Sequence, residues 1–229
     1  MEDAYREWGG RVRGVTVWRR GAAGGTYRVL PDGCMDLIWH EGSLLIAGPD
    51  THAQVGEDSG GSSYAALRFA PGVGPRLLGI PAGEVRDQRV PLEAVWAGGG
   101  ARSLAERIAA DPAAGLDAWA AERASVLEPA DPLAAAVAAA LAGGRSVGEV
   151  AAATGLGERQ LRRRCESAFG YGPKTLARVL RLQRALALAR TGTPFARVAA
   201  DAGYADQPHL AREVKSLAGL PLGELLSGT

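Results

Sequence analysis

One short segment of the sequence gathers charged side chains at the spacing of a helical surface. The segment from Glu158 to about Ala168 is expected to be a helix whose apolar residues pack inward. Four charged residues at i, i+3, i+4 and i+7 would share its opposite face: Arg159, Arg162, Arg163 and Glu166. A guanidinium presents a planar fork of donors that fits O6 and N7 of guanine, so this face is suited to reading base edges in duplex DNA.

The alternative is a solvated charged surface, which is what most charge runs are. Acidic residues would serve solubility equally well, yet they are largely missing from this face. The elements around it favour the first interpretation. Ser146 is expected to cap a preceding helix that has Val147, Val150 and Ala151 on its apolar side, and Gly155 would supply the positive φ of a tight turn between two helices.

The same pattern occurs a second time further along the chain. Thr193-Pro194 is expected to start a helix, Gly203 to centre a turn, and Asp206 to cap a helix that runs to about Leu217. The outer side of that last helix carries Gln207, Ala211, Arg212 and Lys215. A helix from Pro173 to Arg190, roughly 26 Å long, would hold the two units near the groove repeat of about 34 Å.

The segment from Ser146 to Leu222, about a third of the chain, resembles the DNA-binding domain of the AraC/XylS family of bacterial regulators. The matching motifs are Gly170-Tyr171-Gly172-Pro173, Arg181-Leu182-Gln183-Arg184-Ala185, and Ala199 to Tyr204 followed by Gly219-Leu220-Pro221. The resemblance implies base contacts from Arg159, Arg162, Arg163, Gln207, His209, Ala211 and Arg212. It implies phosphate contacts from Lys174, Lys215 and the helix starts at Ser146 and Thr193.

Three residues depart from the family pattern. Cys165 and Val214 stand where the family usually has larger aromatic side chains, so these helices are expected to pack more loosely. Pro208 lies in the first turn of the second recognition helix, where it removes an amide and a side chain that could touch DNA. We therefore expect the first unit to contribute more specificity than the second.

The charge is distributed unequally along the 229 residues. Residues 1–144 carry 13 basic and 18 acidic residues, a net charge of −5, whereas residues 145–229 carry 13 basic and 7 acidic residues, a net charge of +6. A basic module joined to an acidic one is typical of a polyanion-binding domain fused to another domain. We expect an N-terminal domain at 1–128, a linker helix and glycine hinge at 129–144, and a double helix-turn-helix domain at 145–229.

The N-terminal part is expected to be an α+β domain, with a small β-barrel or meander followed by helices, ahead of the all-α DNA-binding domain. Alternation in residues 63–69 is expected to put Leu67 and Phe69 on one face of a strand and Arg68 on the other. Further helices are expected to start at Ser103, Asp117 and Asp131.

The Pro31-Asp32-Gly33-Cys34-Met35-Asp36-Leu37 and Arg68-Phe69-Ala70-Pro71-Gly72 segments of the N-terminal part resemble uncharacterised N-terminal domains of some actinobacterial-type regulators. A barrel could enclose an effector pocket, for which the candidate residues are Trp18, Trp39, His40 and Arg68. The alternative, in which the tryptophans lie in the core and Arg68 lies on the surface, is the favoured one.

No catalytic triad, carboxylate pair or phosphate-binding glycine loop is present in the sequence, so no enzyme activity and no cofactor is expected. His40, His52 and Asp36 lack the clustering of a metal site, and Cys34 is expected to be a buried thiol. The protein is expected to be a cytoplasmic one-component regulator that binds promoter DNA and responds to a small molecule. RNA polymerase and a second copy of the chain are further partners that this hypothesis allows. The competing hypothesis is an N-terminal enzyme or ligand-binding module whose helical domain binds proteins.

Overall fold

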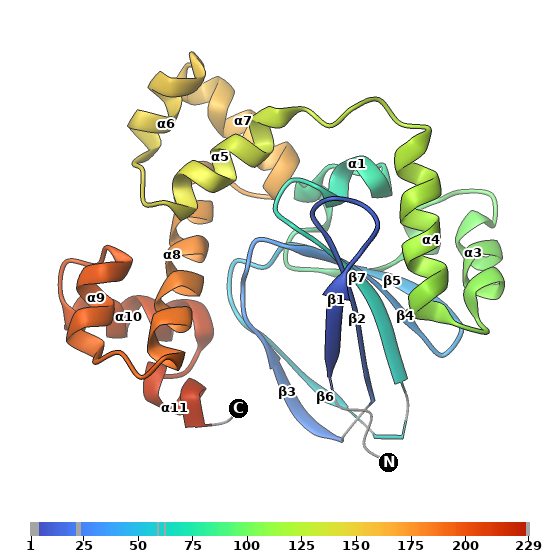
Figure 1. Ribbon diagram of the computed structural model, residues 1–229, viewed down its shortest axis with the longest axis horizontal. Coiled ribbons are helices and arrows are strands. Elements are labelled where there is room, and N and C mark those ends of the chain that lie inside the picture. Colours follow the sequence, from blue (N-terminus) through green and yellow to red (C-terminus); the bar gives the residue numbers. More distant parts are fainter. Residues whose placement is uncertain (1–4, 22–23, 59, 62, 228–229) are drawn as a thin grey trace.

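The computed structural model describes residues 5–21, 24–58, 60–61 and 63–227, and it joins a β-rich N-terminal part to an all-helical C-terminal part (Figure 1). The expected fold class, α+β followed by all-α, is confirmed. In the part of the chain that the structure describes, no helix is both long enough and apolar enough to cross a membrane.

The N-terminal part is built on a six-stranded antiparallel sheet in the order β1-β2-β7-β4-β5-β8. Its strands are β1 Arg6–Gly9, β2 Val15–Gly21, β4 Met35–His40, β5 Ser43–Ala47, β7 Ser63–Phe69 and β8 Arg89–Pro91. A separate two-stranded ribbon pairs β3 Gly25–Val29 with β6 Gln54–Asp58. The strands therefore do not follow chain order as in a simple meander, because β7 returns between β2 and β4.

Local sequence signals explain two features of this sheet. Glu41 and Gly42 connect β4 to β5 with φ values of 47° and 79°, which is the backbone of a tight hairpin turn. In β7 the expected alternation holds, since Leu67 and Phe69 are fully buried on one face while Arg68 lies on the other. The first face packs against helices, and the second faces the β3–β6 ribbon, where Arg20 pairs with Asp58.

The helical layer covers the Leu67 and Phe69 face of the sheet (Figure 1). It consists of α1 Gly74–Leu78, the 3₁₀ turn η1 Ala82–Val85, α2 Leu92–Val95, α3 Gly100–Ile108 and α4 Pro112–Ser125. The predicted helix starts at Ser103 and Asp117 are both wrong. Ser103 lies inside α3, with its amide bonded to the carbonyl of Gly99, and the N-cap of α4 is Asp111 rather than Asp117.

The C-terminal part consists of seven helices within the described residues: α5 Pro132–Ala142, α6 Val147–Thr154, α7 Glu158–Phe169, α8 Pro173–Arg190, α9 Phe195–Ala202, α10 Gln207–Ala218 and α11 Leu222–Ser227. α5 begins as expected, because the carboxylate of Asp131 accepts a bond from the amide of Leu133. α5 to α7 and the first half of α8 share one core, and the second half of α8 shares another with α9 to α11.

The segment between β3 and β4 ties the two parts of the molecule together. Leu30 packs against the core of the second helical unit, and the carbonyl oxygen of Pro31 accepts a 2.7 Å hydrogen bond from Nε2 of Gln183 in α8. Gly33, at φ 82°, lies so close to Leu176 that an added Cβ would be 3.4 Å from that side chain. The helical C-terminal part therefore rests directly on the sheet domain along α8.

Candidate nucleic-acid interface

The first unit is a helix-turn-helix formed by α6 and α7. The hydroxyl of Ser146 accepts a bond from the amide of Glu149, and the Glu149 carboxylate accepts one from the amide of Ser146 at 2.7 Å, which completes a capping box. Gly155 follows α6 at φ 66°, the conformation expected of the turn. Ser146 is therefore committed to this cap, and the Glu149 carboxylate adds a negative charge beside this predicted phosphate contact.

The recognition helix of this unit presents its arginines to solvent. Leu161, Cys165 and Phe169 are buried, whereas Arg159, Arg162 and Arg163 are exposed. Nε of Arg162 pairs with Oε1 of Glu166 at 2.8 Å. Among the described residues, Arg159 and Arg163 form no ion pair, so their guanidinium groups are available to a ligand.

A groove with a volume of about 920 Å³ brings these side chains together. One wall is α7 with Arg159, Arg162 and Arg163, another is the start of α6, and the third is the start of α8 with Lys174 and Thr175. The structure thus places three predicted base contacts and one predicted phosphate contact around one concave surface. Guanidinium and ammonium groups together with helix N-termini are what a DNA backbone and base edges require.

The second unit, α9 and α10, repeats the geometry with fewer charges. Gly203 makes the turn at φ 84°, and Asp206 caps α10 by accepting a 2.6 Å bond from the amide of His209. Gln207, Ala211, Arg212 and Lys215 are all exposed. His209 is half-buried instead: its Nδ1 accepts a bond from the amide of Ala205, and its ring meets the Tyr204 ring edge-on at 5.4 Å.

Two further expectations about this unit have structural outcomes. Thr193 does not start α9, whose N-cap is Pro194, and the Thr193 hydroxyl lies 3.2 Å from that of Thr191. Pro208 occupies the first turn of α10 without interrupting it, because a proline in the first turn forfeits no intrahelical hydrogen bond.

α8 is the rigid connection between the units, and its 18 residues span about 27 Å. Arg178 grips Glu213 of α10 with Nε at 2.9 Å from Oε2 and Nη2 at 3.1 Å from Oε1. These bonds hold the pKa of Glu213 below its usual value. The guanidinium of Arg181 lies 4.8 Å from the centre of the Tyr204 ring, so α8 also fixes the turn before α10.

The N-terminal part holds the C-terminal ends of both recognition helices, which no motif in the sequence indicates. After α7, the carbonyl of Gly170 accepts a 3.2 Å bond from Nη1 of Arg86. After α10, Nη1 of Arg28 donates to the carbonyl of Ala218 at 3.0 Å, and the carbonyl of Leu217 accepts a bond from a backbone amide between β5 and β6. These arginines carry no sequence signal, because their partners are backbone carbonyls more than 80 residues away.

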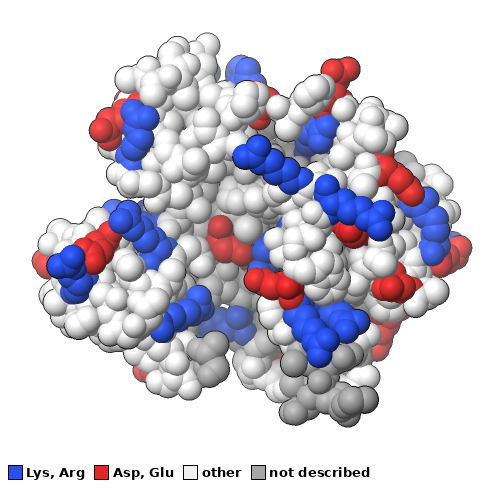
Figure 2. Space-filling view, viewed as in Figure 1, with Lys and Arg blue, Asp and Glu red and all other residues white. Residues whose placement is uncertain are grey.

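Figure 2 shows the two units as separate lobes on the side of the molecule away from the α3 and α4 helices, with Lys and Arg side chains on both lobes. The predicted contacts therefore lie on lobes that project from the sheet domain. Lys174 and Lys215, the two predicted phosphate-binding lysines, are both exposed on these lobes.

The four predicted effector residues do not lie on one face of the sheet. Strand register puts Trp18, His40 and Arg68 on the face opposite the helices, and Trp39 on the helix side, where it packs against the core. The indole of Trp18 donates to Oδ1 of Asp36 at 2.6 Å. Trp39 is thus corrected from a pocket candidate to a residue that borders the core.

Arg68 is the centre of a polar cluster on the sheet face opposite the helices. Its Nε lies 3.4 Å from Oδ1 of Asp36 and 3.8 Å from Oδ2 of Asp32, while His40 stacks on Tyr64 with ring centres 4.2 Å apart. Burial raises the pKa of Asp36 to about 6, although the nearby Arg68 charge opposes this shift. Arg68 is thus part of a structured ion-pair network and not a solvated surface residue.

The structure also shows the environment of Cys34 and of the possible metal ligands. Burial and the charge of Asp32 raise the pKa of the Cys34 thiol, so this cysteine stays protonated and unreactive at neutral pH. In the described part of the chain, no three His, Cys, Asp or Glu side chains converge on a position that could hold a metal ion.

Comparison with known proteins agrees with this geometry. Residues 150–227 match the family described as "Helix-turn-helix domain", and residues 14–91 match a "Domain of unknown function (DUF6597)". A search of curated proteins returned no match.

Solved structures with a similar fold include two of ToxT from Vibrio cholerae. A variant of apo ToxT is 12% identical with a TM-score of 0.50, covering 96% of this chain and 99% of the other. A 1.65 Å structure of ToxT is 10% identical with a TM-score of 0.50, covering 97% and 98%. At these identities the likeness concerns the fold. The chain therefore joins a domain of unknown function at residues 14–91 to a helix-turn-helix domain at residues 150–227.

Proposed function

We propose that this protein is a sequence-specific, one-component transcription regulator that grips duplex DNA with α7 and α10. The observation that carries the proposal is the groove around Arg159, Arg162, Arg163 and Lys174, which lies on the exposed face of a helix-turn-helix. The proposal places the protein in the cytoplasm, with RNA polymerase and a second copy of the chain as further partners.

The division of labour between the two units follows from their side chains. α7 offers three arginines and α10 offers Gln207 and Arg212, with Ala211 available for an apolar contact with a thymine methyl group. His209 is half-buried against Tyr204 and contributes less to base reading than its sequence position suggests. The first unit is therefore the main source of specificity, and the second mainly fixes the position on DNA.

The N-terminal domain would control DNA binding through the ends of the recognition helices. Arg86 holds the turn after α7, and Arg28 holds the turn after α10. Any effector that shifts the sheet domain relative to α8 would reorient both helices together. Trp18, His40 and Arg68 share the sheet face opposite the helices and are the first residues to examine for such an effector there.

Salt-dependent DNA binding tests the proposal directly. The full chain is titrated against its own upstream DNA and against a randomised duplex pool at several salt concentrations, with fluorescence anisotropy as the readout. We expect the logarithm of the affinity to fall linearly with the logarithm of salt, by about 0.9 for each phosphate neutralised. The absence of salt-sensitive binding to both DNAs would refute it and favour a protein-binding role for the helical domain.

A further inference from the structure

A second cavity lies where the N-terminal domain, the linker helix α5 and the first recognition helix meet. Its volume is about 290 Å³, at the lower end of the range for small-molecule sites. Its walls come from the loop and start of α1 (Gly72 to Arg76), from α5, and from the inner side of α7. It is separate from the groove of the proposed DNA interface and from the sheet face that carries Arg68.

The interior of this cavity is apolar. Leu133 and Val137 of α5 face Leu161, Cys165 and Phe169 of α7, and all but Leu133 are buried. Burial raises the pKa of the Cys165 thiol to about 11, so this side chain is a neutral part of the wall at physiological pH. Cysteine is also small, and a larger side chain at this position would occupy part of the space.

The rim is polar and carries a net positive charge. Arg76 donates from Nε to the carbonyl of Glu128 at 2.8 Å and from Nη2 to that of Leu127 at 3.2 Å. Backbone carbonyls carry no formal charge, and within the described residues Arg76 pairs with no carboxylate. Nη1 of Arg164 lies 3.4 Å from Oδ2 of Asp131. The rim thus carries two guanidinium groups, of which only that of Arg164 is paired with a carboxylate.

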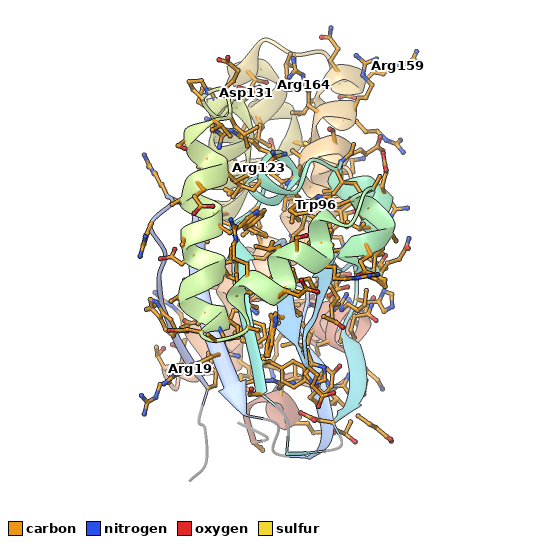
Figure 3. The ribbon with its side chains drawn as sticks, turned by 90° about the vertical axis from the view of Figure 1, so that its right-hand side faces the viewer. Arg19, Trp96, Arg123, Asp131, Arg159 and Arg164 are labelled. Atoms are coloured by element: carbon orange, nitrogen blue, oxygen red, sulfur yellow. The ribbon has the colours of Figure 1, made fainter. Side chains whose placement is uncertain are left out.

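Figure 3 shows Asp131 and Arg164 close together at the end of the molecule where α5 and α7 lie, away from Arg19 at the opposite end. Arg164 is on the same helix as the base-reading arginines, but it points to the α5 side. It was part of the arginine run in the sequence, and the proposed DNA contacts leave it unused.

We propose that this cavity binds a small organic anion, with its apolar body between α5 and α7 and its carboxylate at Arg76 and Arg164. The inference goes beyond the proposed function, since binding at this site requires no DNA. The bound molecule would touch the sheet domain, the linker helix and the recognition helix at once. It would therefore fix the position of α7 relative to the rest of the protein.

The test measures binding of small acids to the full chain without DNA, by calorimetry. The probes are benzoate, phenylacetate and hexanoate, each compared with its neutral primary amide. We expect at least one acid to bind about tenfold more tightly than its amide, because charge-assisted hydrogen bonds are roughly twice as strong as neutral ones. In Arg76→Gln and Arg164→Gln this preference for the acid should fall.

Matched variants on one helix locate the site. Ala134→Leu adds bulk to a cavity wall, whereas Ala135→Leu adds the same bulk to the adjacent exposed position. We expect at least a tenfold loss of binding in the first and none in the second. Ser167→Trp, at an exposed position on the rim, provides a second block that leaves the core intact.

Three outcomes would overturn the inference: no acid in the panel binds, the amides bind as tightly as the acids, or Ala134→Leu and Ser167→Trp bind like Ala135→Leu. Each can occur while salt-dependent DNA binding is intact, so failure here is distinguishable from failure of the proposed function. Conversely, tight acid binding in a chain that ignores DNA would support the site and refute the regulator.

Discussion

Replacing Arg163 by alanine is the sharpest test of how α7 reads DNA. Arg163 is exposed, lines the groove beside α8 and forms no ion pair among the described residues. Its guanidinium can therefore engage a guanine without giving up an intramolecular partner. A bidentate contact of this kind is worth about 1–3 kcal/mol, so we expect a loss of roughly 5-fold to 150-fold at the preferred site.

Arg162 provides the comparison on the same helix face. It is held by Glu166 at 2.8 Å, and that pair must be broken or shared when Arg162 reaches a base. We therefore expect Arg162→Ala to cost less than Arg163→Ala. Glu166→Gln should tighten binding to every sequence, because it removes a negative charge from the groove and releases Arg162.

The assay selects preferred sites from a randomised duplex pool for the parent chain and each variant, and then measures affinity by anisotropy at one fixed salt concentration. Arg163→Ala should relax the base choice at one position and leave the others unchanged. The reasoning is refuted if Arg163→Ala weakens all sequences equally, or if Arg162→Ala proves the more damaging of the two.

Three further results are expected. Lys215→Ala should weaken all sequences alike and reduce the salt slope by about 1, as measured by anisotropy across a salt series; a change in base preference would contradict a phosphate contact. Because Arg178 lowers the pKa of Glu213, the pair stabilises the fold above the ordinary value of 4.5 and loses this contribution as pH falls through the lowered pKa. Urea unfolding should therefore show a stability difference between the parent and Glu213→Gln at pH 7 that shrinks toward pH 3, and a pH-independent difference would count against this account. Gly170→Ala should cost at least about 2–3 kcal/mol in the same assay, because it combines a left-handed backbone with a Cβ that would lie 2.5 Å from a proline of the sheet domain. Gly192→Ala, at a similar φ with open space around it, should cost only about 1–2 kcal/mol, and equal losses would mean that the contact is unimportant.

Helix starts in the C-terminal half were predictable where the cap is made by neighbours in the sequence. In each case the cap residue bonds to a residue only two or three positions away, so the signal is local. The pairs are Ser146 with Glu149, Asp131 with Leu133, and Asp206 with His209. The same logic failed for Asp117, which lies in the middle of α4. Its carboxylate accepts instead from the amide of Arg11, far away in sequence.

In the N-terminal half and in the candidate site, contacts between residues far apart in the sequence limited what could be predicted. Alternation in β7 correctly separated Arg68 from Leu67 and Phe69, but only the register of the folded sheet shows that Trp39 faces the helices. The hydrogen bonds from Arg28 and Arg86 to the ends of the recognition helices could not be predicted from the sequence either. Their acceptors are backbone carbonyls, which every residue type has.

The position of Leu30 bears on how freely this protein could exchange parts with others. Leu30 belongs to the sheet domain, yet it completes the core of the unit that contains α9 and α10. A gene fusion that moved residues 145–229 onto a foreign sensor would leave that hydrophobic surface uncovered. The helical C-terminal part is thus not a self-contained domain, and a functional fusion would have to include the segment between β3 and β4.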